Sequence, residues 1–79
     1  MVHAIACPQF AGFTVTMDND HTGDDIGQGF SPADAFDKCS ADPNCMGFNS
    51  NGWYKTSSTP NLASTGLCLY EKTQAGKLV

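Results

Sequence analysis

The strongest structural signal in the sequence is the stretch Phe36-Asp37-Lys38-Cys39-Ser40-Ala41-Asp42-Pro43-Asn44-Cys45-Met46-Gly47-Phe48-Asn49. It is typical of the last turns of a helix, a sharp turn at Asp42-Pro43-Asn44, and a strand that begins at Cys45. Cys39 and Cys45 flank this reversal. A disulfide between them would join the end of the helix to the start of the strand.

The size of the chain and its cysteines point to a cross-linked domain. The chain has 79 residues and four cysteines. A domain of this size buries only about 60% of its unfolded surface, so it gains from extra cross-links. Two disulfides and an oxidising compartment fit the even cysteine count, and we expect a secreted or cell-surface protein. The alternatives are four reduced cysteines in a cytosolic protein, or a zinc site, although His3 and His21 lie far from Cys39 and Cys45.

Four cysteines allow three pairings. We expect Cys39–Cys45, which closes a small loop, together with Cys7–Cys68, which ties the N-terminal segment to the last strand. In the chain-entropy model these bridges contribute roughly 2 and roughly 4 kcal/mol to stability. The main alternative joins Cys39 to Cys68.

The charge distribution excludes several kinds of partner. The net charge is −4, arginine is absent, and most of the acidic residues lie between Asp18 and Asp42. The lysines do not cluster, so the basic stripe that nucleic acids and anionic surfaces require is missing. No apolar run has the length of a membrane span. We therefore expect no nucleic-acid partner and no membrane insertion. The first residues do not resemble a signal peptide, so a secreted form would have lost its signal or carry it upstream.

The four residues Ser31-Pro32-Ala33-Asp34 predict the start of a helix. Serine caps helices, proline is preset for the first helical position, and an acidic residue in the first turn complements the helix dipole. The helix is expected to run from about Pro32 to about Ala41. Three residues at helical spacing are expected to face the core: Ala35, Phe36 and Cys39.

The remaining patterns indicate strands and loops. Four segments have strand patterns: 13–17, 45–49, 52–56 and 67–72. The second and third are expected to form a hairpin around Asn51-Gly52. Loops are expected over 18–25, before the apolar anchor Ile26, and over 56–66. The sum predicts one α+β domain over 1–79, with a core over about 7–72, in which a single helix packs on a curved antiparallel sheet of four or five strands.

Several of these segments resemble the PAN/apple domain family. The matching features are the run Gly23-Asp24-Asp25-Ile26, the capped helix with Cys39, the segment 42–49, and the closing Cys68-Leu69-Tyr70. The resemblance spans nearly the whole chain and implies a disulfide-stapled curved sheet wrapped around one helix. It also implies Cys39–Cys45, since the corresponding cysteines pair in the family. The sequence that follows Cys45 is most similar to PAN modules of algal and microbial extracellular proteins.

The sequence departs from this family at one position of the helix. Family members usually carry a second helix cysteine one turn earlier, bridged to the strand cysteine that Cys68 matches. Here that position holds Ala35. If Cys39–Cys45 forms, Cys7 is the remaining partner for Cys68.

The acidic loop contains a candidate calcium site formed by Asp18, Asp20, Asp24 and Asp25. Calcium takes six to eight oxygen ligands, and the order of the first acids imitates the start of an EF-hand loop. The twelfth position, however, is Gly29 instead of a bidentate glutamate. The alternative is a solvated loop in which an aspartate caps a turn. We expect neither a bound metal nor a cofactor.

The hairpin carries the candidate ligand-binding residues, which are Asn49, Asn51, Trp53, Tyr54 and Lys55. Adjacent strand residues point to opposite faces, so one of the two aromatic residues is expected to be exposed. An exposed ring beside amide and ammonium groups suits a sugar, whose C–H face stacks on the ring while its hydroxyls form directional hydrogen bonds. The alternative is that Trp53 lies in the core and the asparagines only make turns.

Other notable residues are expected to be structural. Five phenylalanines are expected to form the core: Phe10, Phe13, Phe30, Phe36 and Phe48. His21 lies among carboxylates, where a histidine can respond to pH, but we expect it to be an exposed loop residue. Catalysis is not expected, because the cysteines should be oxidised and no phosphate-loop, HExxH or paired-carboxylate motif occurs.

These observations favour an extracellular, disulfide-bonded module that binds a glycan or an extracellular protein. It would act as an adhesion or recognition unit and would not be an enzyme. The alternative is a structural building block of an extracellular filament or cell wall, in which copies of the module contact one another. A small enzyme or inhibitor is a third, less favoured class.

Overall fold

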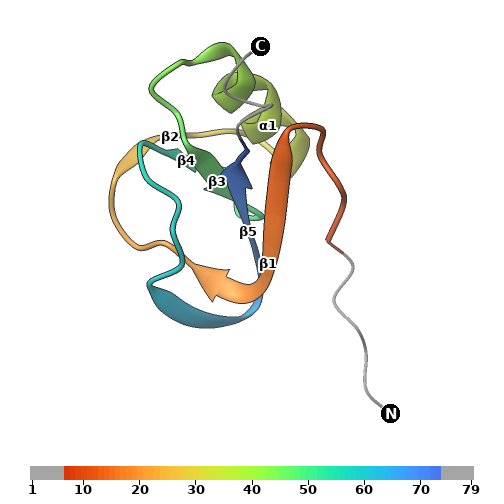
Figure 1. Cartoon of the computed structure of the whole chain (residues 1–79), viewed down its shortest axis with the longest axis vertical. Helices are drawn as coiled ribbons and strands as arrows, with labels where there is room; N and C mark the ends of the chain where they lie inside the picture. Colours follow the sequence, from red (N-terminus) through yellow and green to blue (C-terminus); the bar gives the residue numbers. More distant parts are fainter. Residues whose placement is uncertain (1–6, 74–79) are drawn as a thin grey trace.

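The computed structural model describes residues 7–73, which form one helix and a five-stranded sheet (Figure 1). In chain order the elements are β1 (Phe13–Asp20), β2 (Asp25–Gln28), α1 (Pro32–Ala41), β3 (Gly47–Asn49), β4 (Trp53–Lys55) and β5 (Leu62–Lys72). The strand order across the sheet is β1-β5-β3-β4-β2, and every neighbouring pair is antiparallel. This confirms the predicted α+β class with one helix on an antiparallel sheet.

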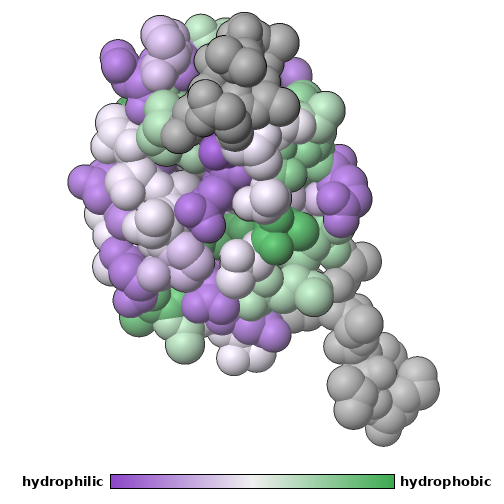
Figure 2. Space-filling view, in the orientation of Figure 1, coloured by the Kyte–Doolittle hydropathy of each residue, from purple (hydrophilic) through white to green (hydrophobic). Residues whose placement is uncertain are grey.

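The surface seen in this orientation is mixed. Figure 2 shows an apolar patch over the middle of β1 and β5, with hydrophilic side chains around it. In the described part of the chain, no helix has the length and apolar character needed to cross a membrane.

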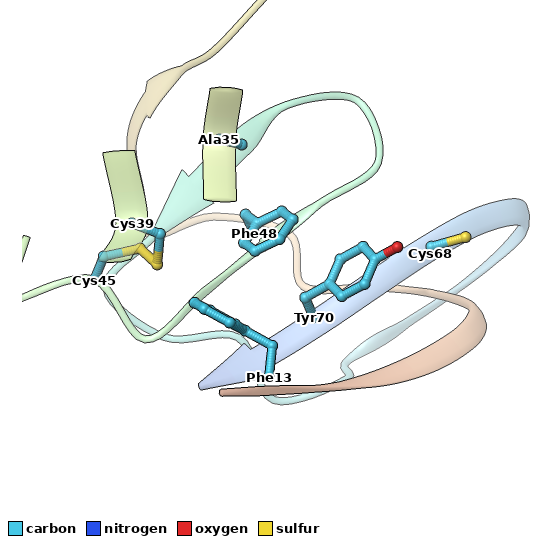
Figure 3. Close-up of a cluster of buried hydrophobic side chains, with 7 residues drawn as sticks. All are labelled: Phe13, Ala35, Cys39, Cys45, Phe48, Cys68 and Tyr70. Carbon is cyan, nitrogen blue, oxygen red and sulfur yellow. A yellow bond between two sulfur atoms is a disulfide. The ribbon is translucent and has the colours of Figure 1, made fainter. Parts of the chain in front are cut away.

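One face of the sheet carries an aromatic core (Figure 3). Phe48 stacks on Tyr70 with ring centroids 4.5 Å apart, and Phe13 meets Phe48 edge-on at 5.1 Å. Phe10 stacks on Phe36 of the helix at 4.9 Å and contacts Tyr70 edge-on at 5.2 Å. Because both α1 and the segment before β1 contribute rings, this cluster fixes the helix and the N-terminal segment to the same face of the sheet.

The predicted inward face of α1 is confirmed. Ala35 and Cys39 are fully buried, and Phe36 packs against the core from the same side of the helix. The helix contacts β3 and β4, the two short strands of the hairpin. Burial of one stripe of an otherwise polar helix is what its sequence pattern predicts.

Phe30 is not a core residue, and the prediction that it is buried was wrong. Its side chain is 99% exposed, and its backbone N–H donates to the carboxylate of Asp34 at 2.9 Å, so it lies just outside the helix start. Tyr70 takes the remaining aromatic place in the core. Its hydroxyl donates to the C=O of Pro8 at 2.8 Å, and burial raises the pKa of the phenol.

The start of α1 is capped as predicted. Ser31 is the N-cap, and its hydroxyl oxygen accepts a hydrogen bond from the N–H of Asp34 at 3.1 Å. The carboxylate of Asp34 accepts bonds from the N–H of Phe30 and from the ammonium of Lys38. These two bonds, the backbone one first, lower the pKa of Asp34 below its ordinary value.

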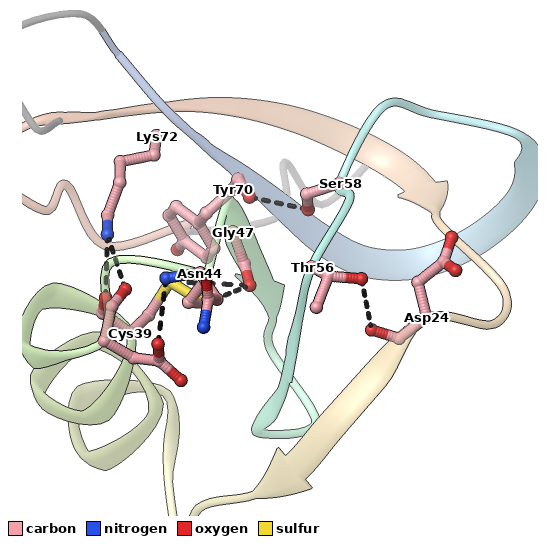
Figure 4. Close-up of a disulfide and its surroundings, with 10 residues drawn as sticks. Asp24, Cys39, Asn44, Gly47, Thr56, Ser58, Tyr70 and Lys72 are labelled. Carbon is pink, nitrogen blue, oxygen red and sulfur yellow. Dashed lines mark hydrogen bonds between the residues drawn. A yellow bond between two sulfur atoms is a disulfide. The ribbon is translucent and has the colours of Figure 1, made fainter.

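The end of α1 is held by a lysine from the last strand (Figure 4). The buried Nζ of Lys72 donates to the C=O of Cys39 at 2.8 Å and to that of Asp42 at 3.2 Å. Burial lowers the pKa of Lys72, against a smaller opposite effect of the nearby Asp42 charge. The last carbonyls of a helix lack helical partners, so this lysine acts as a long-range C-terminal cap.

Both expected disulfides are present. Cys39–Cys45 joins the end of α1 to the segment that enters β3, and Cys7–Cys68 joins the N-terminal segment to β5 across 61 positions of sequence. Residues 7–73 contain no free cysteine. The alternatives of a Cys39–Cys68 bridge, reduced cysteines and a zinc site are therefore wrong.

The strands differ from the prediction in several places, and β3 and β4 are each shorter than expected. β1 continues to Asp20, β2 forms where a loop and an apolar anchor were expected, and β5 already begins at Leu62. Ile26 lies on β2 and is exposed, so it does not anchor the core. The extra length of β1 and β5 comes from their mutual pairing, which includes Asp20 opposite Leu62. Backbone hydrogen bonds sustain this pairing without apolar alternation.

Candidate functional site

The second face of the sheet is covered by loops instead of a helix. Side chains alternate along a strand, so this face carries the residues that point away from the aromatic core. Four polar residues are buried on this side of the molecule: His21, Asn49, Lys55 and Ser58. We call the segments 21–24 and 56–61, which supply or contact these residues, the covering loops.

Gly47 explains how closely the second covering loop approaches the sheet. A Cβ atom at this glycine would lie 2.4 Å from the Cβ of Ser58 and 2.0 Å from the C=O oxygen of Tyr70. Ser58 occupies that space, and its hydroxyl donates to the C=O of Tyr70 at 2.8 Å (Figure 4). The absence of a side chain at Gly47 therefore lets a polar loop pack directly on the sheet.

Lys55 is an interior residue, so its predicted role as a ligand donor is wrong. Its side chain is 3% exposed and forms an ion pair with the carboxylate of Asp25. Its Nζ also lies 3.4 Å from the C=O of Gly23. The lysine therefore ties β4 to β2 and to the first covering loop, and its ammonium is not available to a ligand.

Asn49 is also buried, at 2% exposed, so the prediction that it contacts a ligand was wrong. Its Oδ1 accepts the N–H groups of Asn51 at 3.0 Å and Trp53 at 3.1 Å, and its Nδ2 donates to Asp20 at 3.0 Å. One side chain thus fixes the hairpin turn from inside and links it to β1. The role of Asn49 is to position the residues that follow it.

His21 is 6% exposed, and the expectation of an exposed loop residue was wrong. Its Nδ1 lies 2.6 Å from the C=O of Thr59, and its Nε2 lies 2.6 Å from the carboxylate of Asp24. Burial by itself lowers the pKa of His21. The bonds to Asp24 and Thr59, together with the Asp24 charge, outweigh that effect and the repulsion from Lys55, so the pKa is raised overall. The histidine joins the two covering loops.

The four acids of the calcium hypothesis do not converge. Asp18 accepts the N–H of Gly66, Asp20 bonds to Asn49, Asp24 pairs with His21, and Asp25 pairs with Lys55. Across residues 7–73, no group of three or more acidic, histidine or cysteine side chains is arranged to hold a metal ion. Their charges are used to fasten the loops.

Trp53 is the exposed member of the aromatic pair, as one alternative predicted. Its side chain is 37% exposed, whereas Tyr54 points to the other face and packs against the aromatic core. The interpretation of Trp53 as a core residue is wrong. Directly opposite Trp53 on β2 lies Gln28, which is exposed and whose Nε2 donates to the C=O of Asn51 at 3.0 Å.

We define the Trp53 surface as four exposed residues carried by β2, β4 and the segments next to them at this corner of the sheet: Gln28, Phe30, Asn51 and Trp53. Backbone hydrogen bonds join the segments that carry it. The N–H of Gly29 donates to the C=O of Gly52 at 2.8 Å, and Gly52 has a φ of 92° that disfavours any other residue. The strand β2 and the hairpin turn are thereby locked together, with Phe30 emerging next to the turn.

Sequence reasoning found Asn51 and Trp53 but missed Gln28 and Phe30. The available signal was the pattern Gly27-Gln28-Gly29, because glycines that flank a polar residue mark close backbone approach. A side chain at Gly27 would meet the ring of Tyr54, with its Cβ 2.7 Å from the phenolic oxygen. The glycines thus allow β2 to lie against the hairpin.

No protein-family model, curated protein or solved structure matches this sequence. The likeness to PAN/apple domains accordingly remains a prediction.

Proposed function

We propose that this protein is an extracellular recognition module of the PAN/apple type that binds carbohydrate through the Trp53 surface. The observation that carries the proposal is an indole ring, 37% exposed, on a hydrogen-bonded corner of the sheet that also carries two exposed amide side chains. Two disulfides in so small a domain are typical of extracellular proteins.

The chemistry of this surface suits a neutral ligand that has both apolar and hydroxyl groups. The indole of Trp53 has an apolar face and a polar N–H at its edge. Aromatic residues of this kind suit contacts that stay partly exposed to water. Gln28 and Asn51 offer both donors and acceptors, and none of the four side chains is charged. A sugar ring can stack on the indole while its hydroxyls bond to the amides. A polar protein surface is the second kind of ligand that the same groups would accept.

The pre-formed backbone supports binding with little ordering cost. Asn49 and the contact between Gly29 and Gly52 fix the turn before any ligand arrives. A ligand therefore orders the exposed side chains, but not the loop that carries them. Such preorganisation improves affinity because less conformational entropy is lost on binding.

The test is a glycan array probed with the folded, oxidised domain and with two matched variants. Trp53→Ala should lose about tenfold or more in affinity for any glycan that binds. Leu62→Ala, which truncates an exposed apolar residue at the start of β5, should bind like the original protein. The carbohydrate proposal fails if no glycan binds above background, or if both variants lose binding equally.

A further inference from the structure

The two edges of the sheet differ in how well they are protected against pairing with another strand. β2 has four residues and a register shift between Asp25 and Gly27. β1 has eight residues, and its own register shift lies near its end, between Met17 and Asn19. The five residues before that shift, Phe13–Met17, are regular and contain no charge and no proline. Short or bulged edges resist strand addition, whereas longer uncharged edges invite it. In residues 7–73, no segment pairs with the outer side of β1.

The pairing of β5 identifies which backbone groups of β1 point outward. The C=O of Cys68 accepts the N–H of Ser50, and the N–H of Lys72 donates to the C=O of Met46. The backbone N–H and C=O groups of Cys68 and Lys72 therefore point toward β3. Their partners on β1 are Met17 and Phe13. In an antiparallel ladder, opposed residues that do not bond to each other direct their backbone groups to opposite sides. The backbone N–H and C=O groups of Phe13, Val15 and Met17 therefore point toward the open edge of the sheet.

Two of these outward groups are already bonded inside the chain. The N–H of Phe13 donates to the C=O of Phe10 at 3.1 Å, and the C=O of Met17 accepts the Nδ2 of Asn19 at 2.9 Å. The groups that remain at the edge are the C=O of Phe13, both groups of Val15, and the N–H of Met17. This remaining pattern is self-complementary.

We propose that β1 pairs with β1 of a second copy, antiparallel and centred on Val15, to make a dimer with one continuous sheet. The two Val15 residues then exchange both backbone hydrogen bonds. The N–H of Met17 meets the C=O of Phe13 from the second copy, and the reverse pair forms by symmetry. The two groups that are already bonded, Phe13 N–H and Met17 C=O, fall opposite each other, so no donor or acceptor is left unmatched. A contact of this kind uses the same patch on both subunits, as two-fold dimers do.

Charge and side chains favour the same register. Antiparallel pairing centred on Val15 places Thr14 opposite Thr16 of the second copy, and threonine pairs stabilise neighbouring strands. Asp18 and Asp20 fall beyond the paired segment, because the second copy's chain turns at residues 11–12, before its β1 begins at Phe13. A parallel arrangement would bring the acidic ends of both copies together, which costs stability in a chain with a net charge of −4. Met17, whose side chain is 53% exposed, adds apolar area to the contact.

The dimer would leave the Trp53 surface free. That surface lies at β2 and β4, at the opposite end of the strand order from β1. Pairing through β1 therefore presents two Trp53 surfaces at the two outer ends of one sheet. The inference does not depend on carbohydrate binding, but a bivalent module would gain avidity for a repetitive ligand.

The test measures the monomer–dimer equilibrium by analytical ultracentrifugation over a range of concentrations, with two charge variants of the oxidised protein. In T14K/T16K, each cross-dimer pair places lysine opposite lysine, and we expect the dissociation constant to rise by about tenfold or more. In T14K/T16E, each pair places lysine opposite glutamate, and we expect dimers at least as stable as those of the original chain. Urea unfolding of both variants checks that the monomers fold.

Amide hydrogen exchange gives a second readout, because it locates the contact. At high concentration the N–H groups of Val15 and Met17 should become protected, whereas those of Thr14 and Thr16 should be protected at every concentration. The proposal is overturned if the chain stays monomeric, if both charge variants dimerise equally well, or if the protection on dimerisation appears elsewhere. Glycan binding by monomeric T14K/T16K separates this result from the test of the Trp53 surface.

Discussion

The two faces of the sheet are stabilised in different ways. The aromatic face combines stacked rings, the helix α1 and both disulfides. The polar face has Leu69 as its buried apolar residue and relies on hydrogen bonds and ion pairs that join the covering loops to the strands. In the described residues, every buried side-chain nitrogen and oxygen has a hydrogen-bonding partner. The aromatic face buries most of the apolar core residues, while the hydrogen bonds of the polar face position the exposed residues of the hairpin.

This difference follows from the directionality of the forces. Burial of apolar area is non-directional and contributes in proportion to area. A hydrogen bond contributes about 1 kcal/mol net but requires a defined geometry, and an unsatisfied buried group is costly. A recognition surface needs defined geometry, and the Trp53 surface is built on the side of the hairpin that Asn49 organises.

The largest expected effect on the free energy of unfolding comes from a comparison of two phenylalanines, one buried and one exposed. Phe48→Ala removes a fully buried ring from the centre of the aromatic face and should lower the free energy of unfolding by about 3–5 kcal/mol. Phe30→Ala removes an exposed ring and should change it by less than about 0.5 kcal/mol. Urea unfolding monitored by circular dichroism measures both. A similar loss in the two variants would contradict the assignment of the core to one face.

An intermediate effect is expected from two asparagines of the hairpin. Asn49→Ala leaves the N–H groups of Asn51 and Trp53 without their acceptor and should cost about 2 kcal/mol, because these groups are partly buried. Asn51→Ala changes an exposed side chain and should cost less than about 0.5 kcal/mol. Unfolding in urea gives the stabilities, and Trp53 fluorescence reports whether the turn has moved. Equal stability of the two variants would show that the interior bonds of Asn49 do not organise the turn.

The two faces also differ in how far they could be predicted from sequence. The helix, its Ser31 cap and the Cys39–Cys45 bridge were predicted correctly, because their signals lie within a few neighbouring residues. The polar face was not predicted, because its partners are distant in sequence. His21 meets Thr59 across 38 positions, and Lys55 meets Asp25 across 30. Neither a histidine in a loop nor a lysine in a strand carries a local sign that such a distant partner will bury it.

The error at Phe30 has the same origin. Counting aromatic residues identified a core of about the right size, but it could not distinguish Phe30, just before the helix, from Tyr70 in the last strand. Tyr70 is buried because it lies on β5, between β1 and β3, and because its hydroxyl donates to the C=O of Pro8, which is 62 positions away in sequence. In the candidate site, Gln28 was missed for a related reason, since its place opposite Trp53 depends on the pairing of β2 with β4.

The smallest expected effect is a pH dependence that belongs to the polar face alone. Both ring nitrogens of His21 face acceptors, the C=O of Thr59 and the carboxylate of Asp24, an arrangement that favours the doubly protonated ring. The bond to Asp24 is the main cause that raises the pKa of His21, against the opposing effects of burial and of Lys55. Nearby Asp20 is bonded to the backbone N–H of the same histidine.

A raised pKa in the folded state means that the stabilisation is full below the ordinary histidine pKa of about 6.5 and is lost as pH rises through the folded value. We expect the free energy of unfolding to fall by about 1 kcal/mol across that window, the size of one hydrogen bond. His21→Gln should abolish this dependence, whereas His3→Gln, which changes the other histidine of the chain, should leave it intact. Amide exchange at Thr22 and Asn61, which bond the two covering loops together, should speed up over the same pH range while amides of α1 do not change. If α1 loosens together with the loops, the two faces do not respond separately to pH, and the division of roles between them is wrong.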